Sequence, residues 1–139
     1  MVTVQYVYEF AYIHDPLSGD PFPILLLRIT NPHHPGQALD VNAYLDSGAQ
    51  RSLFDGWIAT SLGFDLLSGR ALSYGSLGGL IGGRLHHVRL SHPDLGEFDL
   101  DIGFSERPIS RNILGRDFFN LIQIGFRERH LTFYVTPTP

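Results

Sequence analysis

Hydrophobic and polar residues alternate along much of this chain with the two-residue period of a β-strand that buries one face. Segments rich in proline, glycine, asparagine and aspartate separate the alternating or apolar runs, as turns do. The pattern therefore predicts an all-β protein. The expected strands are residues 2–12, 24–30, 38–45, 72–74, 84–90, 97–104, 123–126 and 131–135, and the expected loops include residues 14–21, 31–36 and 91–96.

Two short segments break the strand pattern and predict helices. Asp55 can cap a helix over residues 56–62, which Gly63 would end. A second short helix is expected over residues 116–121. The chain contains no internal repeat, low-complexity tract or linker, so we assign residues 1–139 to one domain.

Composition narrows the classes of function. Hydrophobic residues make up 43% of the chain and charged residues 17%, which is typical of a folded protein with a core. A net charge of −4 gives no general attraction to nucleic acid or to an anionic membrane, so we expect neither as a partner. The absence of cysteine excludes disulfides and thiolate metal sites. With no signal-peptide pattern and no long apolar run, the expected location is the cytoplasm.

The segment Asp46-Ser47-Gly48-Ala49 carries the candidate chemistry. It directly follows the predicted strand 38–45, so a strand delivers a carboxylate to a glycine turn. Two carboxylates held close together share one proton and can activate water against a peptide carbonyl. Because the motif occurs once, a second acid would come from another copy of the chain. The alternative interpretation is an ordinary Asx-turn at the end of a strand.

Two segments together resemble the retropepsin family, the retroviral-type aspartic proteases. They are Asp46-Ser47-Gly48-Ala49-Gln50-Arg51-Ser52-Leu53-Phe54 and Asn112-Ile113-Leu114-Gly115-Arg116-Asp117-Phe118-Phe119, with a glycine-rich stretch over residues 75–83 between them. The resemblance, which best fits a cellular or bacterial member, spans roughly residues 38–121. It implies a single-lobe acid protease fold with one or two short helices, completed at its active site by homodimerisation. It also implies an aspartic endopeptidase acting on peptide or protein substrates, without a cofactor.

The resemblance also implies a role for individual residues. Asp46 would be the catalytic acid, Ser47 would brace the pair of loops, and Gly48 and Ala49 would lie along the bound peptide. Residues 75–83 would form a flap that closes over the substrate. The residues that would bind substrate are Gly48, Gln50, Leu77, Gly78, Gly79, Leu80 and Ile81. The residues that would support the catalytic loop from beneath are Ile113, Leu114, Gly115 and Arg116.

Three features depart from the viral pattern. Gln50 stands where many viral members have an acid that pairs with the arginine matched here by Arg116. The segment before Asp46 is longer than in viral enzymes. Prolines in the tail, residues 136–139, predict that this end frays and does not join a paired terminal ribbon.

Rival interpretations remain open from the sequence. The same fold could serve as an inactive peptide-binding or dimerisation module. Half of a two-lobed, pepsin-like protein is disfavoured because there is one motif. No metal site is expected, because adjacent histidines such as His86 and His87 point to opposite faces of a strand and do not chelate together.

Overall fold

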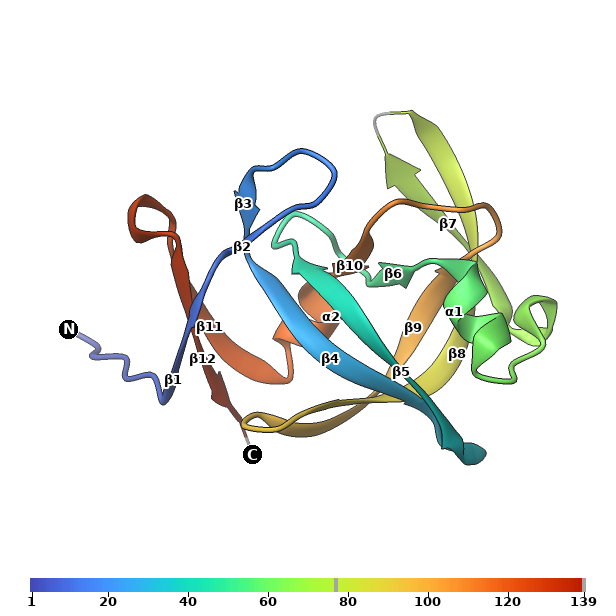
Figure 1. The fold of residues 1–139 in the computed structure, drawn as a ribbon, viewed down its shortest axis with the longest axis horizontal. Coiled ribbons are helices and arrows are strands. Elements are labelled where there is room, and N and C mark those ends of the chain that lie inside the picture. The colour runs from blue at the N-terminus through green and yellow to red at the C-terminus, as the bar shows by residue number, and fades with distance from the viewer. Residues whose placement is uncertain (77, 139) are drawn as a thin grey trace.

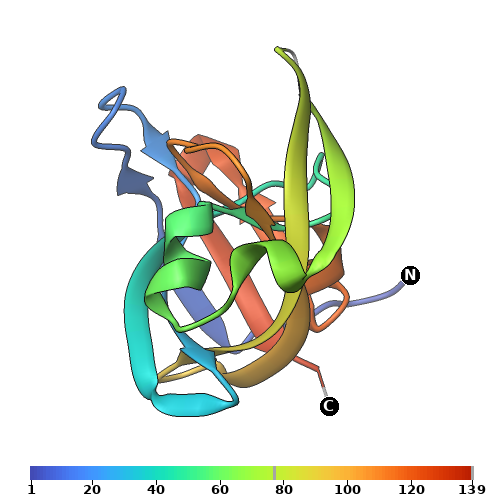
Figure 2. The same cartoon turned by 90° about the vertical axis from the view of Figure 1, so that its right-hand side faces the viewer.

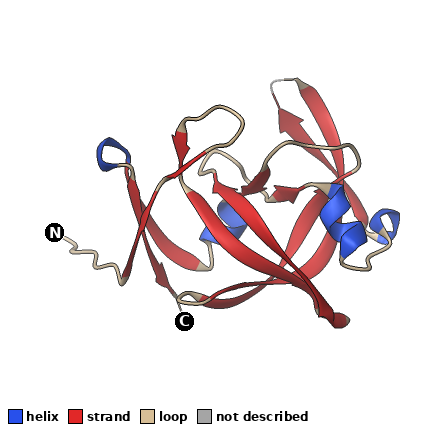
Figure 3. Ribbon diagram, in the orientation of Figure 1, coloured by secondary structure: helices blue, strands red, loops and turns tan. Residues whose placement is uncertain are grey.

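The computed structural model describes residues 1–76 and 78–138, and strands dominate it (Figures 1 and 3). Within these residues the largest sheet has seven strands in the order β4-β5-β10-β6-β9-β8-β7, and β4 also pairs with β8. That additional pairing closes the sheet into a barrel and leaves β7 outside the ring. The strands are β4 (Ile24–Asn31), β5 (His34–Leu45), β6 (Leu53–Phe54), β7 (Arg70–Ser76), β8 (Gly79–His92), β9 (Gly96–Ser105) and β10 (Asn112–Leu114).

A smaller sheet brings the two ends of the chain together. Its order is β1-β12-β11, formed by β1 (Tyr8–Ala11), β12 (Thr132–Pro137) and β11 (Ile122–Arg127). Phe10 of β1 stacks on the fully buried Phe133 of β12, with ring centroids 5.2 Å apart. A two-stranded pairing of β2 (Ile13–His14) with β3 (Pro21–Phe22) connects this sheet to the barrel.

The core follows the alternation of the sequence. In β4 every second residue from Leu25 to Ile29 is buried, while Leu26 and Arg28 between them are exposed. The aromatic rings of Phe54 and Phe104 meet edge to face inside the barrel, with centroids 6.3 Å apart. Burying each such side chain contributes about 1.5–3 kcal/mol, so these residues hold the sheet in one register.

The helices are short and lie at the edges of the barrel. The Asp55 carboxylate accepts the Trp57 N–H at 2.9 Å and caps α1 (Gly56–Ser61). The second helix, α2 (Arg116–Phe119), follows β10, and two 3₁₀ turns complete the set, η1 (Leu66–Ser68) and η2 (Glu128–His130). Both predicted helices are confirmed, the second one shorter than expected. Among the described residues no helix is long and apolar enough to span a bilayer.

The predicted all-β class is confirmed, and several local predictions are wrong. Residues 2–7 do not form a strand, because β12 pairs with β1 only from Tyr8 onward. The expected loops 14–21 and 91–96 are shorter than predicted, because their end residues belong to β2, β3, β8 and β9. Residues 34–36, expected in a loop, extend β5 and pair with the end of β4. The tail does not fray at once, since Thr136 and Pro137 pair with Gln123 and Ile122. The short strands β6 and β10 were not predicted, because two or three residues carry too little periodicity.

Candidate functional site

The Asp46 loop lies where three strands of the barrel meet. β5 runs parallel to β10, so that Leu45 lies beside Leu114, and β10 pairs on its other side with β6. Residues 46–52 leave β5, cross the end of β10 and return as β6. The Asp46 N–H donates to the carbonyl of Leu114 at 2.9 Å, which fixes the start of the loop above this buried residue.

The loop is packed tightly against the start of α2. The Arg116 N–H donates to the Ala49 carbonyl at 2.8 Å. Gly115 passes so close beneath the loop that a Cβ there would lie 2.6 Å from that carbonyl and 3.0 Å from the backbone of Arg51. Real Cβ atoms do not approach a backbone oxygen so closely, so this position requires glycine. The structure thus places Ile113, Leu114, Gly115 and Arg116 beneath and beside the loop.

Ser52 and Asp117 join the loop to α2. The carboxylate of Asp117 accepts the Ser52 hydroxyl at 2.6 Å and the Ser52 N–H at 2.8 Å. The Ser52 oxygen in turn accepts the Gly115 N–H at 3.0 Å. Because Gln50 stands where an acid could pair with Arg116, the sequence did not show what holds the loop in place. In this structure Asp117, the residue after Arg116, holds the loop to α2 through Ser52 instead.

Asp46 lies at a cavity of about 710 Å³ between the loop and the β7–β8 hairpin. The hairpin stands out from the barrel in both views (Figures 1 and 2). The floor of the cavity is formed by Asp46, Ala49, Leu53 and Ile113, and the hairpin contributes Tyr74, Gly75 and Ile81. The loop between β9 and β10 supplies a further wall, residues 108–111. Within the described residues Asp46 is the one acid of this lining.

The structure places the predicted substrate-binding residues in different surroundings, and only some of them line the Asp46 cavity. Ile81 lines the Asp46 cavity, whereas Leu80 beside it is 71% exposed and the glycines at 78 and 79 lie at the exposed turn. Gln50 lines a different cavity, and Leu77 lies outside the described residues. Asp46, Ser47 and Gly48 are exposed, and the Gly48 N–H donates to Asp46 Oδ1 at 2.8 Å. The Asx-turn geometry is therefore present in the same loop.

Arg111 brings a cationic group to the cavity wall, and Asp15 neutralises it. The Asp15 carboxylate is buried and pairs with Arg111 and with the Tyr44 hydroxyl, the latter at 2.5 Å. The guanidinium also lies over the rings of Phe22 and Tyr44, at 5.0 and 5.4 Å from their centroids. Burial acts to raise the pKa of Asp15, but hydrogen bonds from Tyr44, Arg111 and Ser18 outweigh it and hold that pKa well below its usual range.

Tyr74 and the wall at residues 108–111 were missed by sequence reasoning. Tyr74 precedes the glycine-rich stretch, and its ring covers Gly83 and Gly103, where no side chain could fit. Burial raises the pKa of its hydroxyl, which is buried and has no hydrogen-bond partner among residues 1–76 and 78–138. Sequence reasoning could have found Tyr74, because it is an aromatic residue on the inward face of the strand that leads to the hairpin. Residues 108–111 gave no such signal in the sequence, because they belong to an irregular loop.

A single carboxylate on a braced loop, at a cavity beneath a hairpin, can accept a proton from water. Alone it cannot also polarise the carbonyl that the water attacks, because that step needs a second acid holding a proton. The exposure of Asp46 leaves its carboxylate open to a second group.

The fold is that of retropepsin-like aspartic proteases. A retropepsin-like aspartic protease from Rickettsia conorii superposes with a TM-score of 0.63 at 16% identity, covering 96% of each chain. The EIAV protease, solved with the inhibitor HBY-793, superposes with a TM-score of 0.54 at 20% identity, covering 78% of this chain and 92% of that one. No protein-family model matches the sequence, and no curated protein sequence matches it.

Proposed function

We propose that this protein is an aspartic endopeptidase that acts as a homodimer. The observation that carries the proposal is the exposed Asp46 carboxylate, held on a braced loop at a cavity beneath a hairpin, in a fold shared with aspartic proteases. A single copy supplies one acid to the cavity within the described residues. A second copy, related by a two-fold axis near Asp46, would supply the other.

In the proposed mechanism the two Asp46 carboxylates hold one water molecule and share one proton. The ionised carboxylate takes the proton of the water while the protonated one donates to the peptide carbonyl oxygen. The carbonyl carbon becomes tetrahedral, and the amine leaves after it accepts a proton. Ser47 would brace the paired loops through its hydroxyl, and Gly48 and Ala49 would offer their backbone to the substrate.

The β7–β8 hairpin would act as the flap. An extended peptide would lie between it and the catalytic loop and pair with strand backbone on both sides. Tyr74, Ile81 and Ile113 would surround the side chains next to the scissile bond, which favours apolar residues there. Closure of residues 75–83 over the peptide would exclude bulk water from the reacting groups.

Incubation of wild type and Asp46→Asn with a diverse peptide library from about pH 4 to 7 tests the proposal, because a shared proton requires mild acid. We expect cleavage by the wild type and none by Asp46→Asn, with the two proteins equal in thermal stability and in dimer content by sedimentation. Cleavage by pure Asp46→Asn would exclude the mechanism. A wild type that dimerises and binds peptides without cutting them would instead identify a binding module.

A further inference from the structure

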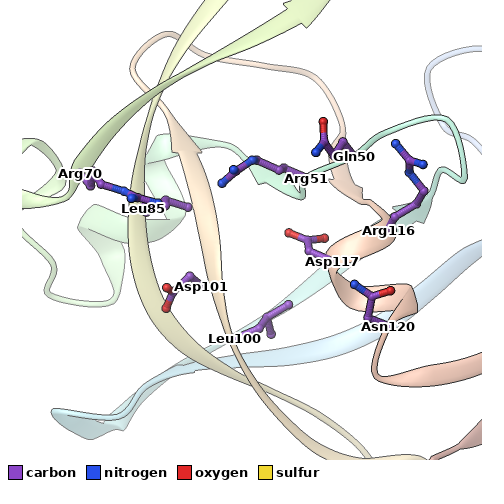
Figure 4. A pocket seen from close by; sticks show the side chains of 9 residues that line it. All are labelled: Gln50, Arg51, Arg70, Leu85, Leu100, Asp101, Arg116, Asp117 and Asn120. Carbon is purple, nitrogen blue, oxygen red and sulfur yellow. The ribbon is translucent and has the colours of Figure 1, made fainter.

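A second cavity, of about 550 Å³, adjoins the catalytic loop and is lined by an excess of arginines (Figure 4). Arg51 comes from the loop after Asp46, Arg70 begins β7, and Arg116 begins α2. In Figure 4 the side chains of Arg51 and Arg70 extend into the space between the β7–β8 region and the catalytic loop. Arg51 and Arg70, from two elements that are distant in sequence, therefore direct positive charge toward this space, whereas the side chain of Arg116 at its edge points away from both.

These arginines differ from four others that are held by acids. Arg28, Arg84, Arg89 and Arg111 each pair with a carboxylate. Within the described residues, no hydrogen bond or ion pair engages the side chains of Arg51, Arg70 or Arg116. A guanidinium offers five donors in a fixed planar arrangement that matches a carboxylate, so these groups are free to bind one.

The two acids of this cavity are already engaged. Asp117 accepts both the hydroxyl and the N–H of Ser52. Asp101 lies 2.8 Å from Nδ1 of His87, and a protonated His87 would neutralise it. The lining, with three arginines against two acids, therefore favours an additional negative group.

Arg51 connects this cavity to the proposed active site. It lines both the arginine cavity and the Asp46 cavity. An extended peptide advances about 3.3 Å per residue and points alternate side chains to one side. A peptide seated over Asp46 would therefore pass Arg51 and present a side chain further along to Arg70.

We propose that the arginine cavity is a distal specificity subsite that binds an aspartate or glutamate side chain of the peptide substrate. The inference rests on the proposed function, because the peptide reaches the cavity only if it lies over Asp46. It defines the substrate class more narrowly: apolar residues at the scissile bond and an acidic residue removed from it along the chain.

Peptide binding to the full chain carrying Asp46→Asn separates recognition from cleavage. Peptides in which one glutamate occupies each position in turn are compared with the matching glutamine peptides by fluorescence polarisation, at low and high salt. At one position we expect glutamate to bind about ten-fold tighter, and salt to reduce the difference. Arg70→Gln should reduce that preference to about two-fold while the glutamine peptide binds as before.

Arg129→Gln is the matched control, since Arg129 is exposed on η2 at the far end of the smaller sheet. It should leave the glutamate preference intact. Cleavage or binding of library peptides with no acidic preference, or with a preference that survives Arg70→Gln, would overturn this inference and leave the proposed function standing. If no peptide is bound or cleaved, the proposed function fails and the subsite fails with it.

Discussion

The Asp46 loop and the β7–β8 hairpin face each other across one cavity, and both depend on glycine, but for opposite reasons. Gly115 beneath the loop has no room for a Cβ, whereas Gly75 in the hairpin has nothing within 4 Å of where a Cβ would lie. The loop is joined to α2 through Ser52 and Asp117. The hairpin is held near its base, where the Glu106 N–H donates to the Gly82 carbonyl at 2.9 Å.

The two sides of the cavity would serve different parts of the proposed reaction. A carboxylate that must meet a symmetry mate needs a fixed position, which close packing of backbone against backbone provides. A segment that must open for a peptide needs backbone freedom and few buried contacts, which an exposed glycine-rich hairpin provides. Substitutions on the two sides should therefore have very different costs.

The largest expected effect comes from adding one methyl group beneath the loop. Gly115→Ala would force its Cβ against the Ala49 carbonyl, so we expect a loss of about 3 kcal/mol of unfolding free energy, or roughly 10 °C in Tm. Gly75→Ala meets open space and should change stability by less than about 0.5 kcal/mol. Chemical denaturation of both variants provides the comparison. Equal stability losses in the two variants would contradict the assignment of a tightly packed Asp46 loop and a loosely packed hairpin.

Removal of the Asp15 charge should rank second. Asp15→Asn leaves Arg111 on the cavity wall without its carboxylate and should lower Tm by less than Gly115→Ala does. The folded-state pKa of Asp15 lies below its unfolded value of about 3.9, so its stabilisation is complete above that pH and is lost as pH falls through the folded pKa.

Thermal unfolding from about pH 7 to pH 2 tests this, because that range crosses the unfolded pKa. The Tm difference between wild type and Asp15→Asn should stay constant down to about pH 5 and narrow in stronger acid. Asp20→Asn, an exposed acid of the same turn, should follow the wild type. A difference that widens toward low pH would contradict the direction of the pKa shift.

The smallest of the stability effects concerns the brace itself. Ser52→Ala removes the hydroxyl that donates to Asp117 and accepts from Gly115, and should cost about 2 kcal/mol. Ser73→Ala, on the exposed face of β7, should cost less than about 0.5 kcal/mol. Chemical denaturation compares the unfolding free energies of the two variants. If Ser52→Ala is as stable as the wild type, the hydrogen bonds of Ser52 do not hold the loop.

The sequence predicted the parts of this molecule that carry a long pattern. β4 and β9 alternate over many residues, and Asp55 before α1 is a capping residue with a local mechanism, so these elements were predictable. The two short strands that frame the Asp46 loop, β6 and β10, were not predictable from periodicity. They become strands because β5 and β9 pair with them, which is a tertiary effect.

The candidate site also contains residues that the sequence predicted and residues that it did not. The motif identified Asp46 and its loop, and the downstream signature identified the residues beneath it. Asp117 as the partner of Ser52 was not predictable, since the two are 65 positions apart and neither fits a local pattern. The pairing of Asp15 with Arg111 spans 96 positions and depends on burial that no short motif encodes.

The most direct test of the central claim, that the active site takes one Asp46 from each of two copies, is a mixing experiment. Wild type at fixed concentration is allowed to exchange with increasing Asp46→Asn protein, and peptide cleavage is followed. Cleavage should fall to about one half at equal concentrations and to about one tenth at nine-fold excess, because mixed dimers lack one acid. Cleavage that stays constant as Asp46→Asn is added would contradict a shared active site.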